Sequence, residues 1–161
     1  GYLSLITDAY SRKIMGYSFR QDLSAEGCID ALKMALHNRL YHHPLIHHSD
    51  RGSQYCSQNY VDLLLKNNIA ISMTENGNPY ENALAERVNG IIKKEFNLYT
   101  SALGFEQTKR QVNASILSYN QLRPHASCDY LTPHQAHLKS EQLKKRWKKY
   151  NRKFNDEKTM V

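Results

Sequence analysis

Two acidic residues stand in surroundings where a carboxylate can do chemistry. Asp50 follows the short strand candidate at residues 45–48 and precedes Arg51-Gly52, and Glu86 lies in a segment with helical periodicity. Open α/β sheets bind ligands beside the carboxyl ends of strands, and carboxylates that project into an open cleft are the hard oxygen ligands that Mg²⁺ prefers. Considered singly, however, Asp50 is more often a turn or cap residue and Glu86 a solvated helix residue.

The elements that must position these residues can be predicted from apolar periodicity and turn residues. Strands are expected at residues 2–7, 13–19, 45–48 and 69–73, and helices at residues 24–40, 57–67, 82–96 and 105–122. Ser24 and Asn82 are suitable N-caps, and Thr132-Pro133 is suited to begin a further short helix. The order indicates an α/β fold in which an antiparallel hairpin shares one sheet with parallel strands.

The helix that carries Glu86 is expected to display it on a polar side. Apolar residues recur at helical spacing from Leu84 to Ile92, whereas Glu86 and Lys93 are offset from them. The stretch before this helix, residues 74–81, contains an Asn-Gly and an Asn-Pro pair, which favour an exposed loop.

Thirty-five residues separate Asp50 from Glu86, and the sequences that flank the two residues indicate a function for the pair. The flanking sequences are HHSDRGSQY at residues 47–55 and GNPYENALAERVNGIIKKE at residues 77–95. Further matching segments are YLSLITDAYSR at residues 2–12, YN at residues 119–120, RPH at residues 123–125 and LTP at residues 131–133. Over nearly its whole length the chain resembles the integrase-core transposases of bacterial insertion sequences, whose core is similar to that of retroviral integrases.

The resemblance implies a ribonuclease-H-like fold, with a mixed sheet flanked by helices, and a DNA transposase activity. Members of this family cleave and transfer DNA strands at an acidic triad with two Mg²⁺ ions, for which Mn²⁺ can substitute. Asp50 and Glu86 match two of the three catalytic, metal-binding carboxylates. The implied partners are transposon ends and target DNA, bound by a homo-oligomer in the bacterial cytoplasm.

The first carboxylate of the triad has no clear match in this chain. In the family it lies in an opening strand that precedes the strand expected here at residues 2–7, and that opening strand is central in the sheet. Asp8 is a weak substitute, because it aligns with the residue that begins the hairpin turn, where turn chemistry explains an Asp. Residues 1–138 are therefore predicted to be an N-terminally truncated core with little activity of its own. The absent strand is expected to leave two unpaired sheet edges, which rearrange or recruit other strands.

Basic residues are concentrated near the C-terminal end. Residues 1–138 contain 13 Lys or Arg and 12 Asp or Glu, whereas residues 139–161 contain 9 and 3. A basic helical tail at residues 139–161 would attract DNA phosphates, although a run of charges is equally typical of a solvated helix face. The predicted DNA-contacting residues are Arg51, Gln54, Tyr80, Lys93, Lys94, Arg123, Lys144, Lys145, Arg146, Lys148 and Lys149, with His48 as a further group beside the carboxylates.

Other functions compete with this interpretation. The histidines at positions 42, 43, 47 and 48, or the pair His134 and His137, suggest zinc, but neighbouring strand residues point to opposite faces and the three cysteines form no CxxC pair. A noncatalytic DNA-binding or assembly module is a second alternative, and a nonspecific nuclease of the same fold is a third. No apolar run approaches the roughly 18 residues that span a bilayer, which argues against a membrane protein.

Overall fold

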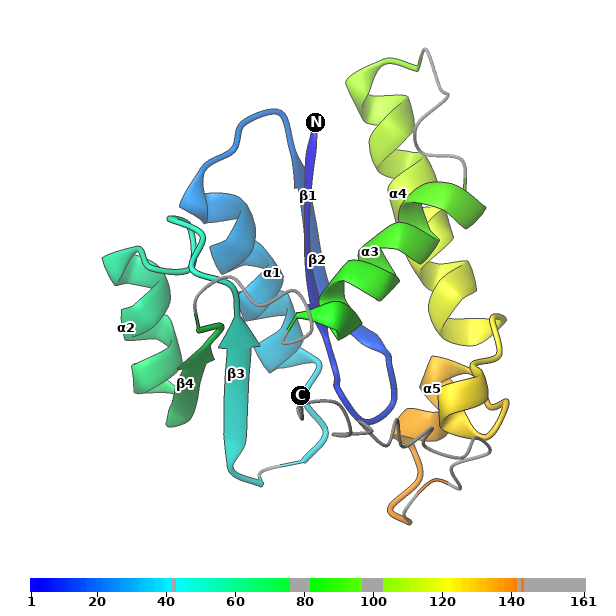
Figure 1. Ribbon diagram of the computed structural model, residues 1–161. Helices are drawn as coiled ribbons and strands as arrows, with labels where there is room; N and C mark the ends of the chain where they lie inside the picture. The colour runs from blue at the N-terminus through cyan, green and yellow to red at the C-terminus, as the bar shows by residue number, and fades with distance from the viewer. Residues whose placement is uncertain (42, 76–81, 97–102, 142, 144–161) are drawn as a thin grey trace, which may run out of the picture.

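The structure, a computed structural model, describes residues 1–41, 43–75, 82–96, 103–141 and 143 of the chain. Its strands are β1 (Tyr2–Thr7), β2 (Ile14–Arg20), β3 (Leu45–Ser49) and β4 (Ile69–Met73). Its helices are α1 (Ala25–His37), α2 (Gln58–Lys66), α3 (Ala83–Glu95), α4 (Phe105–Gln121) and α5 (Pro133–His137), with a 3₁₀ turn η1 (Ala126–Cys128) before α5. Each element lies within a few residues of its predicted position, and the α/β class is confirmed (Figure 1).

β1 and β2 form the predicted antiparallel hairpin. Their pairing begins at Tyr2 with Arg20 and continues to the turn. In the turn, the Asp8 N–H donates to the Lys13 carbonyl at 2.8 Å, and Arg12 adopts a left-handed φ of 66°. A left-handed residue in a short connection allows the two strands to reverse direction with the twist that a hairpin requires.

The first helix lies close to the hairpin because β2 contains a glycine. A Cβ atom built on Gly16 would lie 2.0 Å from the Ala31 carbonyl oxygen and 2.6 Å from the Ala35 nitrogen, both in α1. Ala31 is fully buried in this contact. A larger residue at position 16 would therefore have to push α1 away from the sheet.

β3 and β4 form a parallel pair connected through α2. Pairing runs from Leu45 with Ile69 to Ser49 with Met73, and the Thr74 N–H extends it by donating to the Ser49 carbonyl at 3.0 Å. A buried cluster joins this pair to α1 and α2; it comprises Cys28, Ile29, Leu32, Tyr60, Leu64 and Ile69. The end of β3 is thus held both by sheet pairing and by a packed core.

A second buried cluster joins the hairpin to α3 and α4. It comprises Ile14, Val88, Ile92, Val112, Ile116 and Tyr119. The side chain of Asn120 continues the backbone pairing of β2, because it accepts from the Ile14 N–H at 2.9 Å and donates to the Ile14 carbonyl at 3.0 Å. The helix that carries Glu86 therefore packs with the hairpin.

The hairpin and the parallel strands do not form one continuous sheet in the part of the chain that the structure describes. This corrects the expectation from element order but confirms the two unpaired edges expected from an absent central strand. In the described residues β1 pairs with β2 and β3 pairs with β4, which gives two sheets of two strands each. Figure 1 shows the two pairs with no described strand between them. The physical reason is the one that the resemblance implied: a central strand that would pair with both is missing from the described chain.

Capping chemistry agrees with the prediction at one helix and differs at two others. Thr132 caps α5 as predicted, through a capping box with Gln135. Ser24 and Asn82 occupy the N-cap positions of α1 and α3, but neither side chain makes a capping hydrogen bond. The Ser24 hydroxyl donates to Asp22 instead. Among the described helices, none is long and apolar enough to cross a membrane.

Candidate active site

Asp50 directly follows β3 and begins a tight turn. Its Oδ1 atom accepts a hydrogen bond from the Gly52 N–H at 2.9 Å, a contact typical of an Asx turn. A Cβ atom on Gly52 would lie 3.0 Å from Asp50 Oδ1 and 3.1 Å from Gln54 Oε1, so the turn suits a glycine. Asp50 is exposed to solvent, and its carboxylate is therefore accessible to a ligand.

Arg51 links this turn to the end of the neighbouring strand β4. Its Nε atom donates to the Thr74 carbonyl at 2.8 Å, just beyond the end of β4. Thr74 is itself buried, and its N–H bonds to the Ser49 carbonyl. Arg51, for which the sequence predicts a DNA contact, thus also links the ends of the two strands beside Asp50.

Glu86 lies in the first turn of α3. Its side chain is exposed, and its N–H donates to the Asn82 carbonyl at 3.1 Å. A carboxylate in the first turn of a helix is stabilised by the helix dipole. Val88 and Ile92, which are buried in the core with the hairpin, fix the direction in which α3 presents Glu86.

One groove connects the two elements that carry the carboxylates. Its volume is about 660 Å³, and its lining includes Asp50 just after β3, Asn82 at the N-cap of α3, and Ala85 and Asn89 within α3. Glu86 lies on the same turns of α3 but is not among the lining residues. The structure therefore brings Asp50 and the start of α3 to the same groove, although thirty-five residues separate Asp50 from Glu86 in the sequence.

Asn82 and Asn89 are polar residues of this groove that the sequence did not single out as site residues. Their amides can both donate to and accept from a bound phosphate or water. Asn89 follows Glu86 by three residues, so the two side chains are neighbours on the helix, and this spacing could have identified Asn89. Asn82 was expected to cap α3, a role that its side chain does not perform.

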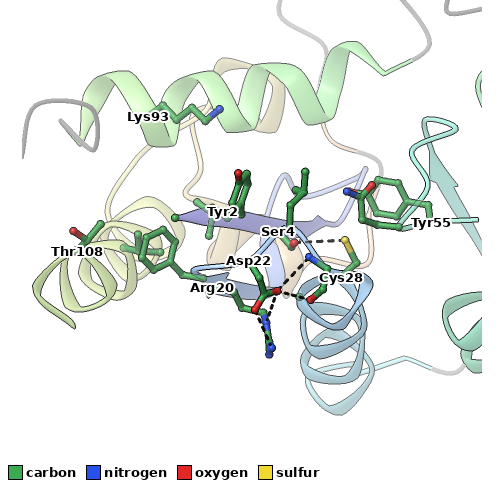
Figure 2. A pocket seen from close by; sticks show the side chains of 16 residues that line it. Tyr2, Ser4, Arg20, Asp22, Cys28, Tyr55, Lys93 and Thr108 are labelled. Atoms are coloured by element: carbon green, nitrogen blue, oxygen red, sulfur yellow. Dashed lines mark hydrogen bonds and ion pairs between the residues drawn. The ribbon is translucent and has the colours of Figure 1, made fainter. Parts of the chain in front are cut away.

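Two predicted DNA-contacting residues, Gln54 and Lys93, line a second hollow of about 460 Å³ beside β1. Figure 2 shows Lys93 on α3, across from Tyr2, with Tyr55 at the side of the hollow toward α1. Tyr55 lines both hollows, so the surroundings of Lys93 and Asp50 adjoin. Lys94 is exposed at the next helix position and lines neither hollow.

The uncharged side chain of Tyr55 lies between the groove and the second hollow and lines both. Burial raises the pKa of its phenol, and the nearby Cys28 and Asp50 raise it further. Its ring packs edge-on against Tyr60, with the ring centroids 5.6 Å apart. At neutral pH Tyr55 therefore offers a hydroxyl group and an aromatic face to a ligand but no charge.

Asp8 lies in the hairpin turn, where its carboxylate is already engaged. Its Oδ1 atom accepts from the Ser11 N–H at 2.7 Å and from the Ser11 hydroxyl at 2.6 Å, and His137 Nδ1 lies 3.7 Å away. Burial opposes ionisation of Asp8, but the hydrogen bonds with His137 and Ser11 outweigh it and lower the pKa to about 2. Asp8 borders the groove as well, yet these contacts explain it as a structural residue.

Arg123 is held in an ion pair with Glu95. Its Nε and Nη2 atoms each lie 2.6 Å from a carboxylate oxygen of Glu95, and Nη1 lies 3.2 Å from His125 Nε2. Burial and the nearby arginines lower the pKa of His125 to about 4, so this histidine is neutral at pH 7. The ion pair links the end of α4 to the end of α3, and a DNA contact by Arg123 stays a prediction.

The remaining predicted contacts lie outside the described residues: Tyr80, Lys144, Lys145, Arg146, Lys148 and Lys149. In the described part of the chain, no three His, Cys, Asp or Glu side chains gather where they could hold a metal ion. Two histidines of β3 have hydrogen-bond partners. His47 Nε2 lies 3.1 Å from the Tyr60 hydroxyl, and His48 Nδ1 lies 2.9 Å from Ser72 Oγ.

Two family models, both described as an integrase core domain, match the chain. One matches residues 1–79 and the other residues 67–133. Together they span Asp50, Glu86 and the elements that position them. The chain belongs to the integrase core family. The resemblance seen in the flanks of the two carboxylates is thereby confirmed.

Relatives of this integrase core are bacterial transposases. The transposase InsF for insertion sequence IS3A of Escherichia coli (strain K12) is 34% identical over 140 residues, which make up 86% of this chain and 49% of InsF. The putative transposase for insertion sequence element IS986/IS6110 of Mycobacterium tuberculosis is 37% identical over 99 residues, or 58% of this chain and 36% of that relative. The integrase core described here spans about half the length of InsF.

A solved integrase structure has the same fold. The HTLV-2 integrase catalytic core domain, solved in complex with magnesium in a trimeric form, aligns with a TM-score of 0.62 and 25% identity over 81% of this chain and 80% of that chain. The predicted ribonuclease-H-like core is therefore confirmed. In this integrase core, the division of the described strands into two pairs leaves the groove that borders Asp50.

Proposed function

We propose that this integrase core cleaves phosphodiester bonds and transfers DNA strands as part of an insertion-element transposase. The observation that carries the proposal is the position of Asp50 at the end of β3, on the same groove as the first turns of α3, where Glu86 lies. The match to this chain covers 49% of the InsF transposase and 36% of the Mycobacterium tuberculosis transposase. We propose the activity of such transposases for the whole protein to which this integrase core belongs.

The two carboxylates suit a divalent metal ion. Asp50 and Glu86 are exposed and offer oxygen atoms, the ligand type of Mg²⁺, which typically binds one or two protein carboxylates together with waters and substrate phosphates. We propose two Mg²⁺ ions, for which Mn²⁺ can substitute. When bound, such ions activate an attacking hydroxyl group and stabilise the leaving oxygen of an in-line displacement.

The side chains around the carboxylates bind and orient the DNA. Lys93 supplies a positive charge and Gln54 an amide in the hollow beside β1, and both suit phosphate oxygens. Asn89 places an amide in the groove, where it can orient a water molecule or a phosphate. The Gly52 N–H holds the Asp50 carboxylate in one orientation, as hydrogen bonds to metal ligands commonly do.

DNA is the proposed partner, both as transposon ends and as target. Further proposed DNA contacts are Arg51, Lys94, Arg123, Tyr80, Lys144, Lys145, Arg146, Lys148 and Lys149. We also propose that the active protein is a homo-oligomer in the bacterial cytoplasm. The HTLV-2 integrase core was solved in dimeric and trimeric forms, which supports self-association of such cores.

The 161-residue chain is proposed to lack strand transfer on its own. Its described residues contain no group of three metal-ligating side chains, and Asp8 is engaged in the hairpin turn through Ser11. Two carboxylates hold a pair of metal ions incompletely, so efficient transfer requires a third ligand that these residues do not supply.

The test is DNA joining by the protein encoded in the full reading frame that contains this chain. With Mg²⁺ and a labelled transposon end, it is expected to join that end to target DNA. Asp50→Asn and Glu86→Gln should each reduce joining at least about 100-fold, because loss of a ligand exceeds the 10- to 100-fold effect typical of groups that only orient one. Asp62→Asn and Glu106→Gln are matched controls, since both are exposed helix carboxylates outside the two hollows.

The products also separate this activity from that of a nonspecific nuclease. Joining at the transposon end is expected, whereas random nicking of the duplex would favour the nuclease. Undiminished joining by the Asp50→Asn protein would contradict the proposed role of this carboxylate.

A noncatalytic DNA-binding or assembly module is the second candidate. The observation that favours it is the lack of a group of three metal-ligating side chains among the described residues. Such a module would bind a labelled duplex equally well before and after Asp50→Asn, with or without Mn²⁺. A metal-dependent core predicts binding that Mn²⁺ strengthens and that Asp50→Asn makes insensitive to the ion, which fluorescence anisotropy can measure.

A further inference from the structure

Three arginines from separate elements lie around the buried His125. Arg12 belongs to the hairpin turn, Arg87 lies in α3 and Arg123 follows the end of α4. Burial is the largest cause that lowers the pKa of His125, and the charges of the three arginines each lower it further. Glu95 acts in the opposite direction. The His125 ring therefore lies in a positive electrostatic field made by three guanidinium groups.

Direct contacts connect the arginine of the hairpin turn with the arginine after α4. Arg12 Nε lies 3.3 Å from Ser127 Oγ, and the Tyr119 hydroxyl donates to the Arg12 carbonyl at 3.0 Å. The Tyr119 ring packs edge-on against His125, with ring centroids 5.0 Å apart. Arg123 Nη1 lies 3.2 Å from His125 Nε2. Figure 1 shows the hairpin turn beside the end of α4, as these contacts require.

Arg87 approaches the other two arginines from α3. It precedes Glu95 by eight residues, with Ile91 midway between them, and residues at this spacing follow one another along one side of a helix. Glu95 pairs with Arg123, so the same side of α3 faces the end of α4. Arg87 is exposed, and its side chain forms no ion pair or hydrogen bond within the described part of the chain.

Most of this positive charge is not compensated. Glu95 pairs with Arg123, but no carboxylate of the described residues lies within ion-pair distance of Arg12 or Arg87. Like charges held close together repel one another, and a bound anion relieves that repulsion. Hydrogen bonds already hold Arg12 and Arg123 in place, so less side-chain freedom remains to be lost when a ligand binds. Guanidinium groups suit phosphate oxygens, which they can bind in pairs.

The position of the three arginines favours DNA as the source of the phosphate. Arg87 directly follows Glu86 in α3, and none of the three lines the groove at Asp50 or the hollow beside β1. A DNA duplex carries about one phosphate per 1.7 Å of its axis. DNA that reaches Glu86 therefore has further phosphates available for the neighbouring side of α3, whereas a free phosphate ion has no link to Glu86.

We propose that Arg12, Arg87 and Arg123 form a phosphate-binding cluster for the DNA backbone. The inference rests on the proposed action on DNA and adds a contact surface to it, formed by the hairpin turn, α3 and the end of α4. Contacts to phosphates carry no sequence information but fix the position of the duplex. The cluster thus holds the duplex at a defined position beside Glu86.

The test is the salt dependence of DNA binding by the 161-residue chain. Fluorescence anisotropy of a labelled duplex of mixed sequence, with EDTA present, gives the affinity at several KCl concentrations. Arg87→Gln is expected to lower the slope of log affinity against log salt by about 0.9, the loss of one phosphate contact. Arg12→Gln combined with Arg87→Gln should lower it about twice as much. Arg87→Lys keeps the charge and should keep the slope.

Arg110→Gln is the matched control. Arg110 is an exposed residue of α4 and is not among the charges that act on His125, so the slope should stay unchanged. An equal fall with Arg110→Gln would show general attraction and overturn the proposal, as would equal slopes for the wild type and Arg87→Gln. Inorganic phosphate at constant ionic strength separates a site for the free ion. Loss of the Arg87 dependence at low millimolar phosphate would also overturn the proposal.

The same measurements separate this inference from the proposed catalysis. DNA binding is measured without metal ions, whereas joining of transposon ends needs Mg²⁺. A protein that joins ends but binds DNA without dependence on Arg87 would refute the cluster alone. Binding that depends on Arg87, in a protein that joins no ends, would support the cluster and refute the proposed catalysis.

Discussion

Two aspartates that each begin a turn illustrate how surroundings decide what a carboxylate does. Asp8 accepts two hydrogen bonds from Ser11 and lies 3.7 Å from His137, so its charge is used inside the fold. Asp50 accepts one from Gly52 and is exposed at the rim of a groove. A carboxylate has about four acceptor positions, and Asp50 has more of them available for a ligand.

Asp8→Asn is expected to destabilise the fold in a pH-dependent manner. The pKa of Asp8 falls from its usual 3.8 to about 2 in the folded chain, so ionised Asp8 stabilises the fold above the unfolded-state pKa and this contribution is lost as the pH falls through the folded-state value. Since the side chain is 31% exposed, about 1–2 kcal/mol is expected at pH 7. The deficit of the variant should shrink between pH 4 and pH 2.

Urea unfolding of the chain and its variant at several pH values measures this difference. Asp62→Asn, at an exposed position of α2, should follow the wild type across the range. A deficit in Asp8→Asn that stays constant from pH 7 to pH 2 would contradict the assigned role of the Asp8 charge.

At the scale of residues, the sequence predicted the site where types and spacing are diagnostic. Asp50 and Glu86 follow from their separation and their flanks. The ion pair between Arg123 and Glu95 joins residues 28 positions apart, one just after α4 and one at the end of α3, and only the packing of α3 against α4 brings them together. Side-chain partners of this kind cannot be predicted from periodicity, which reports on one element at a time.

At the scale of elements, the link between α4 and β2 rests on one amide. Asn120 bonds both backbone groups of Ile14, and the neighbouring Tyr119 donates its hydroxyl to the Arg12 carbonyl at 3.0 Å. Ile14 is paired with Thr7 of β1, and the Asn120 side chain takes the place of a second strand partner beside it. Val88 and Ile92 of α3 pack in the same buried cluster as Ile14 of β2 and Ile116 of α4, so the position of α3 depends on this link.

Asn120→Ala is therefore expected to lower the free energy of unfolding by about 2 kcal/mol. It leaves the N–H and carbonyl of the buried Ile14 without partners, and each unsatisfied buried group costs about 1–3 kcal/mol unless water reaches it. Asn113→Ala, at an exposed position of the same helix, should change the stability by less than about 0.5 kcal/mol. Thermal and urea unfolding compare the two, and similar losses would refute the special role of Asn120.

The elements themselves were largely predictable, because apolar periodicity and turn residues are local signals. The helices begin and end within a few residues of the predicted limits; α1, for example, ends at His37 instead of Leu40. The arrangement of the strands followed from the resemblance, which implied an absent central strand and two unpaired edges, whereas the order of the elements alone had suggested a single sheet. Whether the hairpin and the β3–β4 pair share a sheet depends on a strand between them, and the patterns within each strand carry no information about that neighbour.

At the scale of the whole molecule, the groove unites the features that distinguish this integrase core. It separates the two pairs of strands, borders Asp50 and the start of α3, and contains two buried polar atoms without described partners.

Binding of Mn²⁺ to the 161-residue chain tests the central claim most directly. Asp50 and Glu86 are predicted to share a divalent ion, so electron paramagnetic resonance of free Mn²⁺ should show saturable binding by the wild type. Asp50→Asn and Glu86→Gln should each weaken that binding at least about tenfold, since each removes an oxygen ligand, whereas Asp62→Asn should leave it unchanged. Equal Mn²⁺ affinity in all of these proteins would contradict the account.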